Sequence, residues 1–319
     1  MNKILVIKHG ALGDVVLATG PFQAIRKYHK GDHITLLTTP AFADVLRASG
    51  YFDEIWIDRR PKLYNFLEFF KLIEKIRRGG FTRVYDLQTS ERTFWYFYLM
   101  RAPKPEWVGT AKGASHRHDT PERTKLHTID RQRQQLAIAG IHDMPLPNID
   151  WLKSGIGHFD LPERFAIIVP GGSAHRQGKR WPAHNYGTVC SWLVGQGITP
   201  LLVGTRSETA VISTIESLCP EARSLLGKTN FFELAEIARN AVCAIGNDTG
   251  PMHLIAAAGC RSLVLFSQYS NPELCAPRGA SVTVLQRNPV ASLPAEEVID
   301  WLKQNIQKGT GYDKVSSVS

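Results

Sequence analysis

The residues 246–253, Gly-Asn-Asp-Thr-Gly-Pro-Met-His, follow an apolar run and precede a run of small helical residues. This pattern predicts a strand, a tight polar turn and the start of a helix. Pro251 suits the first turn of a helix, and Asp248 or Thr249 can cap it. The free N–H groups of such a turn, together with the helix dipole, form a site for a phosphate group. A well-capped strand–helix unit without a ligand explains this segment equally well.

A second junction, residues 9–16, places Gly10, Gly13 and Asp14 between a predicted strand and a predicted helix. Glycine lets the backbone approach a ligand closely. The spacing Gly-x-x-Gly differs from the dinucleotide motif G-x-G-x-x-G, and the second strand ends in threonines where a ribose-binding acid would stand. This disfavours a nicotinamide dehydrogenase. Asp14 fits two roles, a helix N-cap and a general base for an acceptor hydroxyl.

A third junction, residues 169–182, combines Gly171 and Gly172 with the cations Arg176, Lys179 and Arg180. A diphosphate leaving group needs such charge neutralisation as its bond to a sugar breaks. The alternative is a solvated basic loop. The sequence contains no D-x-D pair for a metal-held diphosphate and no G-x-S-x-G elbow. We therefore expect cationic side chains and helix N-termini to bind the phosphates.

The composition is that of a soluble globular protein, with 43% hydrophobic and 21% charged residues. No apolar run approaches the roughly 20 residues of a membrane span. The first residues read as a strand and not as a signal peptide. The five cysteines have no C-x-x-C spacing, which favours reduced thiols in the cytoplasm. The net charge of +9 favours anionic partners without choosing among them.

Predicted strands and helices alternate along most of the chain, and several strands are continuous apolar runs. The predicted strands are 3–8, 33–39, 54–58, 83–88, 165–170, 198–204, 241–246, 261–266 and 281–285. The predicted helices are 14–29, 41–48, 64–77, 130–139, 183–196, 206–218, 231–239, 251–258 and 294–307. This pattern is typical of doubly wound parallel sheets covered on both faces.

The alternation is predicted to break at residues 89–130 and again at 144–162, where prolines and glycines concentrate. We interpret the second break as a linker. The expected organisation is an N-terminal acceptor-binding domain, residues 1–155, a C-terminal donor-binding domain, residues 156–308, and a flexible tail, residues 309–319.

Taken together, the three junctions resemble the heptosyltransferases of glycosyltransferase family nine. The resemblance rests on residues 7–17 with Pro21, on 170–171 with 179–182, and on 247–253 with the small residues that follow. It implies a GT-B fold, in which two Rossmann-like domains face a central cleft. It also implies an inverting, metal-independent transfer of heptose from the donor substrate ADP-heptose, without a cofactor, to a lipopolysaccharide core acceptor.

The resemblance also implies roles for individual residues. Asp14 matches the catalytic base, and Lys179 matches a residue near the donor phosphates. Donor-binding residues are expected in the loops of both C-terminal junctions: Ser173, Lys179, Arg180, Asp248, Thr249, Gly250, Pro251, Met252 and His253. For His253 a purely structural role is an equal alternative. The diphosphate is expected at the N–H groups of residues 249–252. Residues 171–178 do not align with the family pattern, which leaves the partners of Arg176 and Arg180 open.

On the acceptor side we place Gly10, Gly13 and Arg92. Residues 92–133 hold nine Lys and Arg against four Asp and Glu. This segment fits either an anionic lipopolysaccharide acceptor or a solvated basic loop. An aromatic-rich helix at residues 66–73 with flanking cations permits peripheral contact with an anionic membrane, although a core helix with a basic rim is favoured. The expected location is cytoplasmic, with peripheral contact at the inner face of the inner membrane.

Three other functions stay open at this stage. A GT-B transferase of a different nucleotide-sugar or acceptor has the same phosphate contacts. A non-catalytic nucleotide-sugar-binding protein fits less well, because Asp14 and Lys179 are both present. Nucleic-acid binding rests on charge alone, and the aromatic run 94–98 is too continuous for a base-stacking platform.

Overall fold

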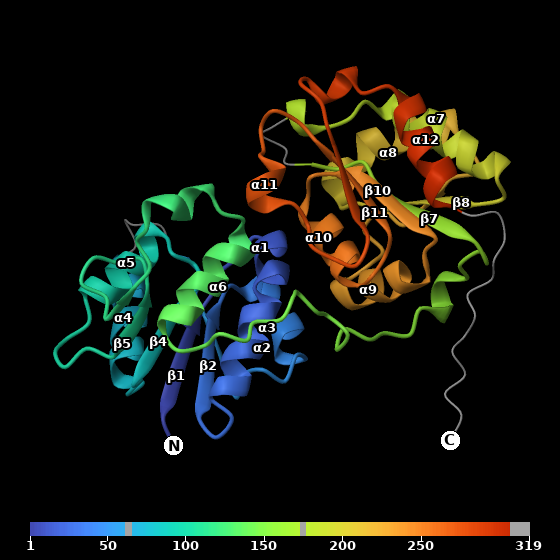
Figure 1. Ribbon diagram of the computed structural model, residues 1–319. Coiled ribbons are helices and arrows are strands. Elements are labelled where there is room, and N and C mark those ends of the chain that lie inside the picture. Colours follow the sequence, from blue (N-terminus) through green and yellow to red (C-terminus); the bar gives the residue numbers. More distant parts are fainter. Residues whose placement is uncertain (61–65, 173–176, 307–319) are drawn as a thin grey trace.

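The computed structural model describes residues 1–60, 66–172 and 177–306, which form two parallel six-stranded sheets with helices on both faces (Figure 1). The strand orders are β3-β2-β1-β4-β5-β6 and β12-β11-β10-β7-β8-β9. Counted from the first strand of each half, both orders read 3-2-1-4-5-6, the order of a Rossmann fold. The prediction of two doubly wound, Rossmann-like sheets is confirmed.

The first half contains the following elements. Its strands are β1 (Lys3–Ile7), β2 (His33–Thr38), β3 (Glu54–Ile57), β4 (Arg83–Asp86), β5 (Glu106–Gly109) and β6 (His116–Arg117). Its helices are α1 (Leu12–Leu17), α2 (Thr19–Tyr28), α3 (Pro40–Arg47), α4 (Phe66–Arg78), α5 (Glu91–Tyr98), the 3-10 helix η1 (Pro121–Lys125) and α6 (Thr128–Ile138).

The second half repeats the arrangement. Its strands are β7 (Phe165–Val169), β8 (Thr199–Leu202), β9 (Arg223–Ser224), β10 (Cys243–Asn247), β11 (Ser262–Phe266) and β12 (Val282–Gln286). Its helices are α7 (Ala183–Gly195), α8 (Thr209–Leu218), α9 (Phe231–Asn240), α10 (Gly250–Ala257), α11 (Pro272–Cys275) and α12 (Ala295–Asn305). Short 3-10 helices are η2 (Gly157–Phe159), η3 (Gln177–Lys179), η4 (Arg206–Glu208) and η5 (Val290–Ser292).

The central strand β1 explains why the strand sequences are continuously apolar. Ile4 and Val6 belong to the core cluster that contains the buried residues of α2, and Leu5 and Ile7 to the cluster that contains those of α4. Successive side chains of a strand point to opposite faces, so a sheet covered on both faces buries every residue.

Two details of the predicted pattern were wrong. Residues 89–130 continue the alternation, because Ser90 caps α5 by accepting from the Thr93 N–H, and β5 and β6 follow. The predicted helix 14–29 is two helices. The Thr19 hydroxyl donates to the Val16 carbonyl at 2.8 Å, a local bond that competes with helix continuation.

The segment between α6 and β7 contacts both halves. The Asn148 N–H donates to the Thr19 hydroxyl at 3.1 Å, and the Arg239 guanidinium donates to the carbonyls of Ile149 and Leu152. A domain boundary at residue 155 stays a prediction, and the predicted tail 309–319 lies outside the described residues. In the described part of the chain, no helix has both the length and the apolar character to cross a bilayer.

Candidate active site

The three predicted junctions lie at the carboxyl edges of the two sheets, where the strand order reverses. These reversals occur between β1 and β4 in the first half and between β7 and β10 in the second. In open α/β sheets, ligands bind in the crevice at this point. The two edges face each other, and α1 lies next to α10 (Figure 1).

Two glycines allow α1 and α10 to pack closely. A Cβ atom added at Gly13 would lie 2.8 Å from Cδ2 of His253, and one at Gly250 would lie 2.9 Å from Cβ of Leu12. A side chain at either position would force the neighbouring side chain to shift or the helices to separate. The beginnings of α1 and α10, and therefore the first and third junctions, meet across the boundary between the halves.

Asp14 lies in the first turn of α1 and is partly exposed. Its Oδ2 accepts a hydrogen bond from the Ala11 N–H at 3.1 Å, and its Oδ1 accepts none from the described residues. The charges of Asp14 and Asp248 both act on the pKa of His253 and on that of Cys275. Asp14 therefore shares one electrostatic environment with residues of the opposite half.

Lys179 and Asp248 form an ion pair that joins the loops after β7 and β10. The distance from Nζ to Oδ2 is 2.9 Å, and the two side chains are 13% and 12% exposed. The Ser270 hydroxyl donates to the same Oδ2 at 2.6 Å. The lysine side chain is thus held at the carboxyl edge of the sheet, where its charge suits a bound diphosphate.

Asn247 holds the two C-terminal junctions together. Its side chain is fully buried, and Oδ1 accepts from the Trp181 N–H and the Tyr186 hydroxyl, both at 3.0 Å. Its Nδ2 donates to the carbonyls of Pro170 and Gly171 at 2.8 and 3.0 Å. This residue has a structural role that satisfies all its hydrogen-bonding groups.

The start of α10 presents backbone donors, although fewer than the sequence predicted. The Met252 N–H donates to the Thr249 carbonyl, and Pro251 has no N–H. The N–H groups of Thr249 and Gly250 donate to no acceptor among the described residues. The Thr249 hydroxyl is buried without a partner there. The available donors are therefore concentrated at the first two residues of the turn, while the Met252 side chain is fully buried.

His253 is buried in the contact between the halves, with 7% of its surface exposed. Burial lowers its pKa to about 4, and the carboxylates of Asp248 and Asp14 oppose that shift only in part. The imidazole is therefore neutral at pH 7. Its Nδ1 is buried and has no partner among the described residues.

The remaining predicted donor residues differ in their surroundings. Arg180 donates from Nη2 to the Gly172 carbonyl at 2.8 Å. Ser173 and Arg176 lie outside the described residues.

The sequence reasoning missed Glu208, a carboxylate after β8 that lies near the Arg180 charge. It accepts hydrogen bonds from the Thr205 N–H and hydroxyl and from the Ser207 hydroxyl, at 2.7–2.8 Å. A Cβ atom at Gly171 would lie 2.7 Å from Cγ of Glu208, so this acid borders the glycine loop. The sequence signal that could have identified Glu208 is its position after the second strand of a Rossmann unit, where a ribose-binding acid is usual.

On the opposite side, Arg92 is tied into a buried network. Its Nε and Nη2 donate to the Asp58 carboxylate at 3.0 and 3.1 Å, and the Tyr96 hydroxyl also donates to Asp58. The His9 ring lies 3.3 Å from the same carboxylate. Gly10 has a φ of +130°, and a Cβ atom there would lie 2.6 Å from Cε2 of Phe42, so only glycine fits. This network supports the loop that carries Asp14.

A second group of charges lies beside Asp14, and the sequence analysis predicted only part of it. Lys8 is buried, and burial lowers its pKa, while the charges of Asp14 and Asp86 oppose that shift. Burial raises the pKa of Asp86 to about 6. Arg131 acts on the pKa values of Lys8, Arg123 and Cys275. The basic segment 92–133 thus contributes the cations Arg123 and Arg131 to the surroundings of Lys8 and Asp86.

Within residues 1–60, 66–172 and 177–306, no three His, Cys, Asp or Glu side chains cluster as metal ligands would.

Comparisons with known proteins place the chain in a family. The model of glycosyltransferase family 9 (heptosyltransferase) matches residues 69–298. Lipooligosaccharide heptosyltransferase 2 of Haemophilus influenzae is 30% identical over 131 residues, which is 40% of this chain and 38% of that protein. The chain therefore matches well under two thirds of that relative's length.

Two solved structures have the same fold. The glycosyl transferase family 9 protein from Veillonella parvula has a TM-score of 0.83 at 21% identity, with 96% of this chain and 97% of that chain covered. The E. coli heptosyltransferase WaaC with ADP has a TM-score of 0.76 at 18% identity, with 95% and 99% covered. The GT-B prediction is confirmed.

Proposed function

The chain belongs to glycosyltransferase family 9, the heptosyltransferases, and from this premise we propose that it transfers heptose from ADP-heptose to a lipopolysaccharide core acceptor, with inversion and without a metal ion. The observation that carries the proposal is the arrangement across the cleft. Asp14 lies on one side of the α1–α10 contact, and the Lys179–Asp248 pair lies on the other.

The donor site is proposed at the C-terminal half. The diphosphate accepts hydrogen bonds from the N–H groups of Thr249 and Gly250 and receives positive charge from Lys179. These groups stabilise the charge that develops on the departing diphosphate. Glu208 suits the ribose hydroxyls, since its carboxylate borders the loop after β7. Ser173, Arg180, Pro251 and Met252 stay predictions as lining residues of the same site.

The chemical step is proposed to use Asp14 as the base. Its carboxylate accepts the proton of the acceptor hydroxyl as that oxygen attacks the anomeric carbon from the face opposite the diphosphate. The new bond forms as the bond to the diphosphate oxygen breaks, which inverts the configuration. His253 is neutral at pH 7 because burial lowers its pKa, so it adds no charge between the base and the donor.

The acceptor is proposed to bind at the N-terminal half. Arg123 and Arg131 place positive charge on that side, which suits the carboxylates and phosphates of a lipopolysaccharide core. Arg92 acts through Asp58 and the loop that holds Asp14. Since such an acceptor is anchored in lipid, the enzyme is proposed to work in the cytoplasm at the inner face of the inner membrane.

The test is a calorimetric binding screen of ADP-, UDP-, GDP- and CMP-linked sugars, followed by transfer to a lipopolysaccharide core acceptor. We expect selective binding of the ADP series and a product with inverted anomeric configuration by NMR. Selective binding of another nucleotide would assign a different transferase of the same fold. Tight ADP-heptose binding without transfer to any core acceptor would favour a non-catalytic binding protein.

A further inference from the structure

Five large apolar side chains on α4 and α5 face solvent. The exposed fractions are 62% for Phe66, 76% for Leu67, 51% for Phe70, 55% for Trp95 and 45% for Tyr98. The core does not need them, because α4 packs against the sheet through Phe69, Ile73 and Ile76. We call these five residues the α4–α5 face. Exposed large apolar side chains on neighbouring helices are typical of an interaction site.

The two helices run side by side. The rings of Phe69 and Tyr96 lie 5.9 Å apart, and Nε of Arg77 donates to the Leu99 carbonyl at 2.8 Å. Each helix follows a strand of the first sheet, β3 or β4, and therefore begins at the carboxyl edge. Helices α4 and α5 lie on the side of the N-terminal half that is remote from the C-terminal half (Figure 1). The N-terminal ends of both helices thus lie at the same edge of the sheet as Asp14.

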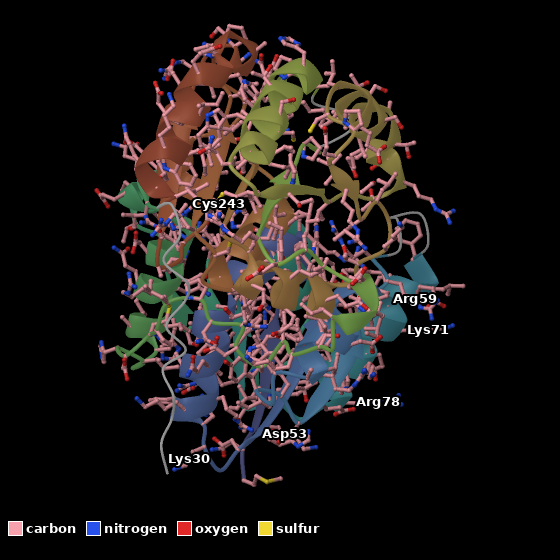
Figure 2. The ribbon with its side chains drawn as sticks, turned by 90° about the vertical axis from the view of Figure 1, so that its right-hand side faces the viewer. Lys30, Asp53, Arg59, Lys71, Arg78 and Cys243 are labelled. Carbon is pink, nitrogen blue, oxygen red and sulfur yellow. The ribbon has the colours of Figure 1, made fainter. Side chains whose placement is uncertain are left out.

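Cations surround the face. Helix α4 carries Lys71, Lys75, Arg77 and Arg78 against Glu68 and Glu74. Figure 2 shows Arg59, Lys71 and Arg78 along one flank of the molecule. A trough of about 460 Å³ between α4 and the end of β3 is lined by Arg59, Lys71 and Lys75 and by the acids Asp58 and Glu68. Its three cations outnumber its two acids, which suits the phosphate of an anionic lipid headgroup.

We propose that the α4–α5 face docks on a bilayer that contains anionic phospholipid, with the apolar side chains in the interfacial layer and the cations at the headgroups. The proposal specifies the membrane partner and rests on the proposed function, whose lipid-anchored acceptor lies in such a bilayer. A second copy of the chain is a poorer occupant, because two such faces would bring their cations together. An amphipathic helix with this division of residues lies in the plane of the interface.

The test is sedimentation of the full chain with vesicles of phosphatidylcholine alone or mixed with phosphatidylglycerol. We expect binding to the mixed vesicles only, and weaker binding at high salt because screening shortens the reach of the cations. The double variant Phe66→Ser/Leu67→Ser and the variant Lys71→Glu should each lower the vesicle partition coefficient by about tenfold.

Matched controls lie elsewhere on the N-terminal half. Ile138→Ser removes an exposed apolar residue of α6, and Arg47→Glu reverses a cation that pairs with an acid three residues away, as Lys71 does. Both should bind vesicles like the parent chain. Trp95 is exposed, so its fluorescence should be quenched on vesicles that contain brominated lipid. The variant Trp95→Phe should lack the quenched component.

Several results would overturn the proposal. These are equal binding to both vesicle types, unchanged binding by the α4–α5 variants, and unquenched Trp95. Dimerisation that Phe66→Ser/Leu67→Ser abolishes would assign the face to a second copy. ADP binding and transfer to a deacylated, soluble acceptor should stay unchanged in these variants. Failure of transfer in the parent chain would refute the proposed function while leaving vesicle binding intact.

Discussion

Replacement of Lys179 by alanine should separate the stability of the donor loops from their affinity for a diphosphate. The Lys179–Asp248 pair has an Nζ–Oδ2 distance of 2.9 Å and is largely shielded from water. Loss of one partner of a fully buried pair costs about 3–5 kcal/mol. Because Ser270 still donates to Asp248 and the site is partly exposed, we expect about 1–2 kcal/mol here.

The effect on the donor should be larger than the effect on the fold. A hydrogen bond to a charged group contributes about 1.5–3 kcal/mol, so the Kd for ADP should rise by about 10- to 100-fold in Lys179→Ala. Calorimetry with ADP measures this change, and urea unfolding measures the stability. Lys228→Ala, an exposed lysine of the same half, is the control and should change neither.

The double variant Lys179→Ala/Asp248→Asn tests the reasoning further. Neutralising Asp248 removes the uncompensated carboxylate, so the stability should return toward that of the parent chain while ADP binding stays weak. An unchanged Kd for ADP in Lys179→Ala would refute the assignment of this lysine to the diphosphate. Recovery of full affinity in the double variant would show that the single variant had only distorted the loop.

Three further predictions concern the contact between the halves. The pKa of His253 is lowered to about 4 from 6.5. As pH falls, the unfolded chain therefore binds the proton first, and the folded state loses stability. Between pH 7 and 4.5 the free energy of unfolding, measured by urea titration, should fall by about 2 kcal/mol more in the parent chain than in His253→Gln. A pH-independent difference between the two would contradict this. Gly13→Ala places a methyl group 2.8 Å from His253 and should lower the free energy of unfolding by about 1–3 kcal/mol. The same substitution should cost less stability in a His253→Ala background. If the effects of the two substitutions on stability simply add, the proposed contact is wrong. Cys275 lies among the charges of Asp14, Lys179 and Asp248, so bound ADP should slow its alkylation, and unchanged labelling would place the donor elsewhere.

Much of the fold was predictable because buried parallel strands are continuous apolar runs. All nine predicted strands occur, since each, like residues 165–169, is long enough to show its pattern. The strands β6 and β9 have two residues each and carry no periodicity. They form only because a neighbouring strand pairs with them. The split after α1 depends on one hydroxyl–carbonyl bond, which no apolar pattern reports.

The candidate site was predictable in its location and not in its contacts. Lys179 and Asp248 each follow a strand at the same edge, so their proximity follows from the topology. Their ion pair depends on side-chain positions that the sequence does not specify. His253 is buried against Gly13, and Lys8 is surrounded by charges, because segments far apart in the sequence pack together. The sequence alone does not show such packing. Glu208 was missed because it lies at the end of the 3-10 helix η4 (Arg206–Glu208) and not directly after β8 (Thr199–Leu202).

The central claim is that Asp14 is the base for glycosyl transfer, and the most direct test is the single-turnover rate of Asp14→Asn with ADP-heptose and a lipopolysaccharide core acceptor. Because a positioned base contributes about 10²–10⁴ in rate, we predict a loss of that size, with ADP affinity and urea unfolding unchanged. A transfer rate equal to that of the parent chain would contradict the account.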